Sequence, residues 1–158
     1  MPGSGKSTVG AALAKLMGLE VVDTDALIES RENQSLQQIL DQRGKTVFLE
    51  IEETVLMNMP LYSSIISTGG SVVYSENIMR RLSEESIVIY LQATLKTIEN
   101  RVALAPQRGI AAPPEQALLD VYDERLPLYE RYGQFVVNCD HDSPENIARH
   151  IEMHCSKG

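Results

Sequence analysis

A glycine-rich segment near the N-terminus has the composition of a phosphate-binding loop. It matches the second half of the pattern G-x-x-x-x-G-K-[ST], in which backbone N–H groups and a helix N-terminus surround phosphate oxygens. We expect the Lys6 ammonium to add positive charge and the Ser7 hydroxyl to bind Mg²⁺. The segment consists of Gly3, Ser4, Gly5, Lys6, Ser7 and Thr8. The sequence therefore predicts a nucleoside triphosphate site, although a Gly-Ser tail preceding a helix has the same composition.

Two acidic residues follow the first apolar strand of the chain. Asp23 and Asp25 come directly after the apolar stretch 19–22. Open α/β sheets bind their ligands at the carboxyl ends of strands, which is where these two carboxylates should lie. The alternative is an Asp-rich turn that caps a helix starting near Ala26.

The elements that must position these residues alternate between helix and strand. Hydrophobic periodicity and capping residues predict helices at about 7–17, 35–43, 46–59, 76–82, 95–103 and 115–132, and another from Pro144. Short apolar runs predict strands at 19–22, 64–67, 87–91 and 135–137. This order predicts an α/β fold of three layers, a parallel sheet flanked by helices, in a single domain over residues 1–158.

Size and charge narrow the class of protein. The chain has 158 residues and a formal net charge of −8, which argues against a broad basic face for nucleic acid or an anionic membrane. No apolar run reaches the roughly 18 residues that cross a bilayer. Two cysteines are too few for a disulfide framework. We therefore expect a cytoplasmic protein that binds anions only locally.

The first half of the phosphate-loop pattern is missing. Its first glycine would fall one residue before Met1, and no strand precedes the loop. Loss of a strand inside a sheet leaves buried backbone groups unpaired, at about 1–3 kcal/mol each. We expect either a start site assigned too late, or a first strand that another segment or a second chain replaces. The second case predicts a dimer where a monomer is otherwise expected.

This gap predicts weak nucleotide binding and lowered stability for the 158-residue form. The physical reason is that the loop has no strand to anchor its N-terminal side. Calorimetric titration of the purified 158-residue protein with ATP measures the effect, and a tight affinity would contradict the expectation.

The order of motifs resembles that of shikimate kinases over nearly the whole chain. The shared motifs are Gly-Ser-Gly-Lys-Ser-Thr, Asp23-Thr24-Asp25 with Ile28-Glu29, Phe48 with Glu52-Glu53, Ser67-Thr68-Gly69-Gly70, Arg108 in a proline-rich loop, and Arg125-Leu126-Pro127-Leu128-Tyr129. The resemblance implies the fold of nucleoside monophosphate kinases, a P-loop NTPase fold with a five-stranded parallel sheet. It also implies an acceptor-binding helical segment at about 26–60 and a lid at about 104–116.

The resemblance implies roles at the nucleotide end of the site. Lys6 would hold the β- and γ-phosphates of ATP, and Ser7 would bind Mg²⁺, which Asp23 would contact through water. Arg101 would pack against adenine. Arg108 would reach from the lid to the phosphoryl group in transfer, where neutralising oxygen charge does most of the catalysis.

At the acceptor end, the resemblance implies a pocket for a small hydroxy acid. Asp25 would hydrogen-bond the attacking hydroxyl and help to remove its proton. Gly69 and Gly70 would line the pocket, and Arg125 would bind the acceptor carboxylate. For Arg125 the alternative is a surface ion pair with Glu124.

One departure from the family concerns the acceptor carboxylate. Leu49 stands where family members carry an arginine after the phenylalanine, and a leucine supplies no donor. Losing one charge-assisted contact of this kind costs about 2–5 kcal/mol. Arg43 lies nearby in sequence, on the other side of Gly44. The lid reads Arg-Gly-Ile where the family usually has Arg-Pro-Leu, and Thr68 replaces the first of three glycines.

These observations predict an ATP-dependent kinase of the shikimate kinase type. Two alternatives stay open: a related kinase with a different small acceptor, because Leu49 makes the pocket less cationic, and a degenerate nucleotide-binding protein that acts through a partner. ATP consumption with shikimate separates the first from both others.

Overall fold

The computed structural model describes residues 1–104 and 117–156. Arg108 and most of the predicted lid therefore lie outside the described residues. The elements are α1 (Lys6–Met17), β1 (Glu20–Asp23), α2 (Thr24–Glu32), α3 (Leu36–Asn58), β2 (Ser64–Ser67), the 3₁₀ turn η1 (Val72–Tyr74), α4 (Glu76–Glu85), β3 (Ile89–Gln92), α5 (Leu95–Leu104), α6 (Leu118–Tyr132), β4 (Phe135–Asn138) and α7 (Pro144–Cys155). None of these helices combines the length and the apolar character that a bilayer span requires.

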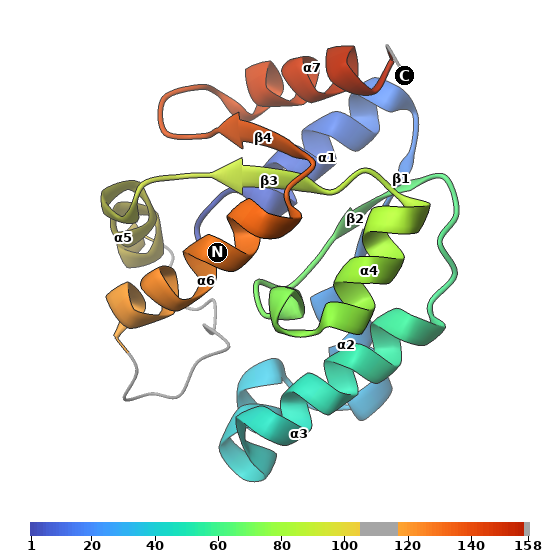
Figure 1. Ribbon diagram of the computed structural model, residues 1–158, viewed down its shortest axis with the longest axis vertical. Coiled ribbons are helices and arrows are strands. Elements are labelled where there is room, and N and C mark those ends of the chain that lie inside the picture. The colour runs from blue at the N-terminus through green and yellow to red at the C-terminus, as the bar shows by residue number, and fades with distance from the viewer. Residues whose placement is uncertain (105–116, 157–158) are drawn as a thin grey trace.

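Helices cover both sides of the strands, as the alternating pattern predicted. In Figure 1, α1 passes behind β3 and β4 while α6 lies in front of them, and α7 packs along α1. The α2–α3 pair extends away from the strands at the opposite end from α7 (Figure 1). The prediction of an α/β fold with parallel strands flanked by helices is confirmed.

The strands form two separate parallel pairs. β1 pairs with β2 with Glu20 opposite Ser64, and β3 pairs with β4 with Ile89 opposite Phe135. Among the described residues, no strand precedes α1 and none joins β2 to β3. The five-stranded sheet that the resemblance implied is thus represented by four strands in two pairs.

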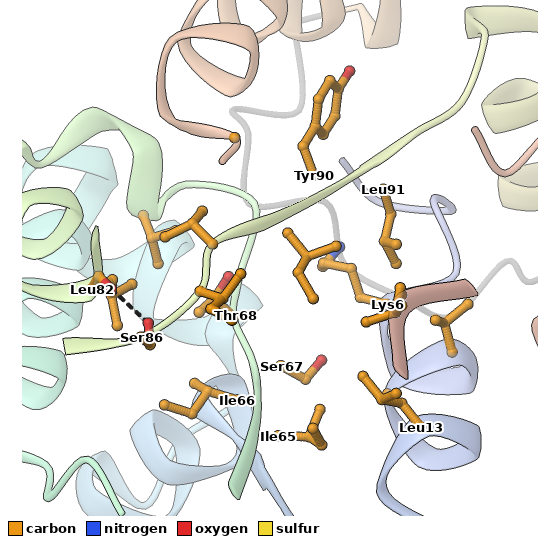
Figure 2. Close-up of a pocket in the computed structure, with 18 of the residues that line it drawn as sticks. Lys6, Leu13, Ile65, Ile66, Ser67, Thr68, Leu82, Ser86, Tyr90 and Leu91 are labelled. Atoms are coloured by element: carbon orange, nitrogen blue, oxygen red, sulfur yellow. Dashed lines mark hydrogen bonds between the residues drawn. The ribbon is translucent and has the colours of Figure 1, made fainter. Parts of the chain in front are cut away.

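A cavity of about 540 Å³ lies between the two pairs of strands. All four residues of β2 line it, together with most of β3 and the inner side of α1. Figure 2 shows Leu13, Ile65 and Leu91 around this space, with Lys6 beside it. The cavity therefore connects the unpaired edges of two sheets with the start of the phosphate loop.

Helix α3 is fixed at its start and interrupted inside. The Ser35 side chain accepts from Gln38 N, and the Gln38 side chain accepts in return from Ser35 N, which forms a reciprocal capping box. Gly44 then breaks the helical geometry with φ 80° and ψ 169°. The predicted end at Gly44 and restart near Thr46 correspond to this kink, so α3 consists of two helical segments joined at Gly44. Beyond the break, α3 buries Phe48 and Glu52.

The capping box predicts a measurable contribution to stability. Replacing Ser35 with Ala removes one side-chain acceptor from the first turn and should lower the free energy of unfolding by about 1 kcal/mol. Urea unfolding followed by circular dichroism measures the change. Thr54→Ala on the exposed side of the same helix is the control and should shift stability by no more than about 0.5 kcal/mol; equal losses in both variants would contradict the assignment.

Candidate active site

The phosphate loop turns sharply into α1 through two left-handed glycines. Gly3 has φ 72° and Gly5, the N-cap, has φ 96°, a region that side chains with a β-carbon rarely occupy. The Met1 carbonyl accepts from Ser4 Oγ at 2.9 Å and from Lys6 Nζ at 2.7 Å. These contacts hold the loop at the N-terminus of α1, where amide groups and the helix dipole favour an anion.

Arg101 lies against the same loop from α5. Its guanidinium donates to the Gly3 carbonyl at 3.3 Å and to the Cys139 carbonyl at 2.6 Å. The backbone of α5 also lies close to Gly3, since a β-carbon at position 3 would be 3.3 Å from Ile98 O. Arg101 therefore ties the loop to the end of β4, and its contact with adenine stays a prediction.

Asp23 caps α2, as the alternative interpretation of this residue predicted. Its Oδ1 accepts from Asp25 N at 2.9 Å and from Ala26 N at 3.3 Å. The helix begins at Thr24, two residues before the predicted start. Capping and metal contact are compatible because both capping hydrogen bonds end on the same carboxylate oxygen, Oδ1.

The two predicted metal ligands have the chemistry that magnesium prefers. The Ser7 hydroxyl and the Asp23 carboxylate are hard oxygen donors, and Mg²⁺ typically takes one or two protein oxygens together with substrate phosphates and waters. Within residues 1–104 and 117–156, no three His, Cys, Asp or Glu side chains form a metal-binding group.

Gly69 allows two carboxylates to approach one point at the end of β2. A β-carbon at position 69 would lie 2.7 Å from Asp25 Oδ1 and 2.9 Å from Glu52 Oε1, distances too short for any real side chain. Gly69 N donates to Thr24 Oγ1 at 3.2 Å, and Thr24 is fully buried. The predicted residues Asp25 and Gly69 are thus brought together, although 44 residues separate them.

Arg125 is an interior side chain, only 1% exposed. Its Nε donates to the Tyr74 hydroxyl at 3.1 Å, and a β-carbon at position 70 would lie 2.9 Å from its Nη1. The Tyr129 hydroxyl donates to the Gly70 carbonyl at 2.7 Å, which fixes the turn beside the guanidinium. The surface ion pair considered for Arg125 is therefore excluded by its burial.

Residues predicted for the nucleotide and for the acceptor line one cavity. Lys6, Gly69 and Gly70 all line the cavity between the strand pairs. Position 70 also lies against Met1, because its β-carbon would be 3.7 Å from Met1 Cα, and the Met1 carbonyl binds Lys6. Asp25 contacts the same glycine turn. The phosphate loop and the acidic residue are therefore on the same side of the molecule.

Glu52 is a functional candidate for which the sequence pattern predicted no role. Its side chain is 1% exposed and its Oε1 accepts from Ser71 Oγ at 2.8 Å. Burial raises the pKa of Glu52 to about 7, with a contribution from the Asp25 charge, while the Ser71 hydrogen bond and Arg125 act in the opposite direction. The available signal was its position in the Phe48, Glu52-Glu53 motif, which carried the resemblance but indicated no chemistry.

Arg43 does not replace the arginine that Leu49 displaces. Its guanidinium donates to Glu32 Oε2 and to Gln34 Oε1, both at 2.8 Å, on the exposed side of the α2–α3 pair. Leu49 packs against the main hydrophobic core.

Comparison with known proteins decides the family. The family model described as "Shikimate kinase" matches residues 2–155. This chain belongs to the shikimate kinase family. The shikimate kinase of Actinobacillus pleuropneumoniae is 34% identical over 152 residues, covering 94% of this chain and 88% of that protein. The shikimate kinase of Paracidovorax citrulli is 35% identical over 166 residues, covering 97% and 87%.

Solved structures agree with the family at the level of the fold. The shikimate kinase from Acinetobacter baumannii, solved in complex with shikimate, is 26% identical with a TM-score of 0.87, covering 99% of this chain and 89% of that one. The enzyme from Bacteroides thetaiotaomicron also reaches a TM-score of 0.87, at 22% identity, over 98% and 93%. The predicted membership of the shikimate kinase family is confirmed.

The buried carboxyl of this shikimate kinase homologue predicts a specific pH dependence of stability. The folded state holds Glu52 with a raised pKa of about 7, so it favours the protonated form. The associated stability is complete below the unfolded pKa near 4.5 and is lost as pH rises toward 7 and beyond. Glu52→Gln, which cannot ionise, should remove this loss, which amounts to about 3 kcal/mol at most.

Urea unfolding at pH 5 and pH 8 tests this in the wild type and the variant. The difference between the two pH values should shrink in Glu52→Gln and stay at the wild-type size in the control Glu50→Gln, an exposed glutamate on the same helix. Identical pH dependence in all three proteins would show that the Glu52 carboxyl does not titrate differently on folding.

Proposed function

We propose that this protein transfers the γ-phosphoryl group of ATP, in the presence of Mg²⁺, to a hydroxyl of shikimate. The observation that supports the proposal is that Lys6, Gly69 and Gly70 line one cavity, while Asp25 lies against Gly69 and Arg125 lies against Gly70. Phosphoryl transfer needs this combination, because positioning and neutralisation of oxygen charge account for most of its catalysis. Family membership and the shikimate complex of the A. baumannii relative favour the same acceptor.

At the nucleotide end, the loop binds and orients the triphosphate. The amides of residues 3–8 and the Lys6 ammonium surround phosphate oxygens, and Lys6 exchanges its contact with the Met1 carbonyl for one with phosphate. Ser7 and Asp23 would hold Mg²⁺, which supplies charge neutralisation for the phosphates when bound. Arg101 supports the adenine side. Arg108, outside the described residues, is proposed to reach the transferring group.

At the acceptor end, Asp25 accepts the proton of the attacking hydroxyl. Gly69 and Gly70 leave room for the acceptor ring beside the carboxylate, since side chains there would collide with Asp25 and Arg125. Arg125 binds the acceptor carboxylate. Glu52 lies behind Gly69, where the Asp25 charge contributes to its raised pKa.

The proposal also covers the class of substrate, the cellular location and the oligomeric state. The substrates are small molecules, and no role for nucleic acid or membrane is proposed, because the net charge is −8. We place the enzyme in the cytoplasm, where ATP and Mg²⁺ are available, and propose that it acts as a monomer.

Leu49 keeps a second candidate function in consideration. A pocket without the usual arginine favours a less acidic hydroxylated acceptor, with the same phosphoryl-transfer chemistry. A degenerate protein that binds ATP without transfer is the third candidate, and turnover measurements distinguish all three.

Release of ADP in the presence of ATP, Mg²⁺ and shikimate tests the proposal. Asp25→Asn should lower kcat by about 10²- to 10⁴-fold because it removes the proton acceptor, while ATP binding is unchanged. Asp41→Asn, an exposed aspartate on α3, is the matched control and should retain wild-type turnover.

The alternatives give distinct outcomes in the same assay. Turnover with another hydroxy acid or a nucleoside, but none with shikimate, would assign a different acceptor. ATP binding without turnover on any acceptor, or an Asp25→Asn variant as active as the wild type, would contradict the proposed mechanism.

A further inference from the structure

We propose that Lys45 supplies the second positive charge that binds the acceptor carboxylate, in place of the arginine that Leu49 displaces. This inference rests on the proposed function, in which Arg125 binds that carboxylate from the other side. Lys45 lies four residues before Leu49 on α3, so the two side chains are on the same side of the helix, one turn apart. Leucine at position 49 supplies no hydrogen-bond donor. The lysine side chain is long enough to span one helical turn and bring its ammonium to that region.

The Tyr74 ring connects Lys45 with Arg125. Lys45 Nζ lies 4.7 Å from the centre of this ring, and Arg125 Cζ lies 5.2 Å from the same point. The two cations are therefore separated by at most the sum of these distances, about 10 Å. A carboxylate with one oxygen on each cation bridges most of that separation, since each charge-assisted hydrogen bond is about 2.8 Å long. Movement of the flexible lysine closes the rest.

The ion pair that Lys45 makes in this structure can be exchanged for a substrate. Lys45 Nζ lies 3.5 Å from Glu124 Oε1, and the two side chains are 32% and 41% exposed. Pairs this exposed contribute little, about 0–1 kcal/mol, because water screens them. Glu124 thus holds the ammonium beside Tyr74 at low energetic cost, and an incoming carboxylate competes with it for the same charge.

The break at Gly44 separates Lys45 from the neighbouring cation. Arg43 and Lys45 are two residues apart, yet Arg43 pairs with Glu32 while Lys45 pairs with Glu124 on α6. Gly44, with its left-handed φ of 80°, changes the direction of the chain between them. Of these two cations, only Lys45 lies beside a residue that Arg125 also contacts, so Arg43 provides a matched control.

The test compares Lys45→Met, Lys45→Arg and Arg43→Met. Lys45→Met keeps the length of the side chain and removes its charge, and it should raise KM for shikimate by about 10- to 100-fold, the range for one hydrogen bond to a charged group. Its kcat and its KM for ATP should stay within about twofold. Lys45→Arg should restore most of the affinity, and Arg43→Met should behave as the wild type.

A neutral acceptor makes the test specific for the carboxylate. The methyl ester of shikimate lacks the negative charge, so the wild type should bind it more weakly than the acid in calorimetric titration. Lys45→Met should bind the ester with the same affinity as the wild type, because the ester has no carboxylate for the Lys45 ammonium to bind. Thermal melting of each variant verifies that the fold is retained.

The outcomes distinguish failure of the Lys45 inference from failure of the proposed function. Wild-type turnover of shikimate with an unchanged KM in Lys45→Met would overturn the Lys45 inference and leave the proposed function standing. An equal loss for acid and ester, or a loss confined to kcat, would likewise overturn it, since neither reports on a carboxylate contact. A wild type that neither phosphorylates nor binds shikimate would overturn both.

Discussion

The absence of side chains at Gly69 and Gly70 is the constraint on which the site depends. A β-carbon at either position would collide with a charged group, with Asp25 and Glu52 at the first and with Arg125 at the second. The two glycines therefore let two carboxylates and a guanidinium, from three different helices, converge on the end of one strand. Backbone, rather than side chain, fills the space between these opposite charges.

The charges around this turn are balanced by burial as well as by pairing. Glu52 and Arg125 are both 1% exposed, so each would be costly to bury alone. Ser71 and Tyr74 donate or accept the hydrogen bonds that satisfy them. The raised pKa of Glu52 is the consequence of placing a carboxyl in this interior beside Asp25. A carboxyl buried in this way lowers the free energy of unfolding as pH rises toward 7.

The cavity between β2 and β3 relates the sheet to the phosphate loop. In a continuous parallel sheet the strand edges pair with one another, whereas here two pairs are separated by apolar side chains around an open space (Figure 2). The loop beside it is held by local contacts, from Ser4 and Lys6 to the Met1 carbonyl and from Arg101 to Gly3. These contacts preserve the turn into α1 although β2 and β3 are not joined beneath it.

The sequence by itself determined the local features, because they depend on neighbours within a few residues. Propensity, capping and periodicity predict the GKST turn, the start of α3 after Ser35, the break at Gly44 and the strands of the described residues. The family resemblance added the identities of Asp25, Gly69, Gly70 and Arg125 as one set. Their roles remain predictions.

Only the tertiary structure decided which residues that are distant in sequence lie in contact. The packing of α3 and α6 beside the η1 turn determines the burial of Arg125 and Glu52 and the placement of Lys45 against Tyr74. The pairing of Arg43 with Glu32 depends on how α2 packs against α3. No local pattern encodes these contacts, since each joins segments that are far apart in the chain or separated by a change of direction at a glycine. Burial and charge pairing are properties of the packed fold, and they set the pKa of Glu52 and the cations available to a substrate.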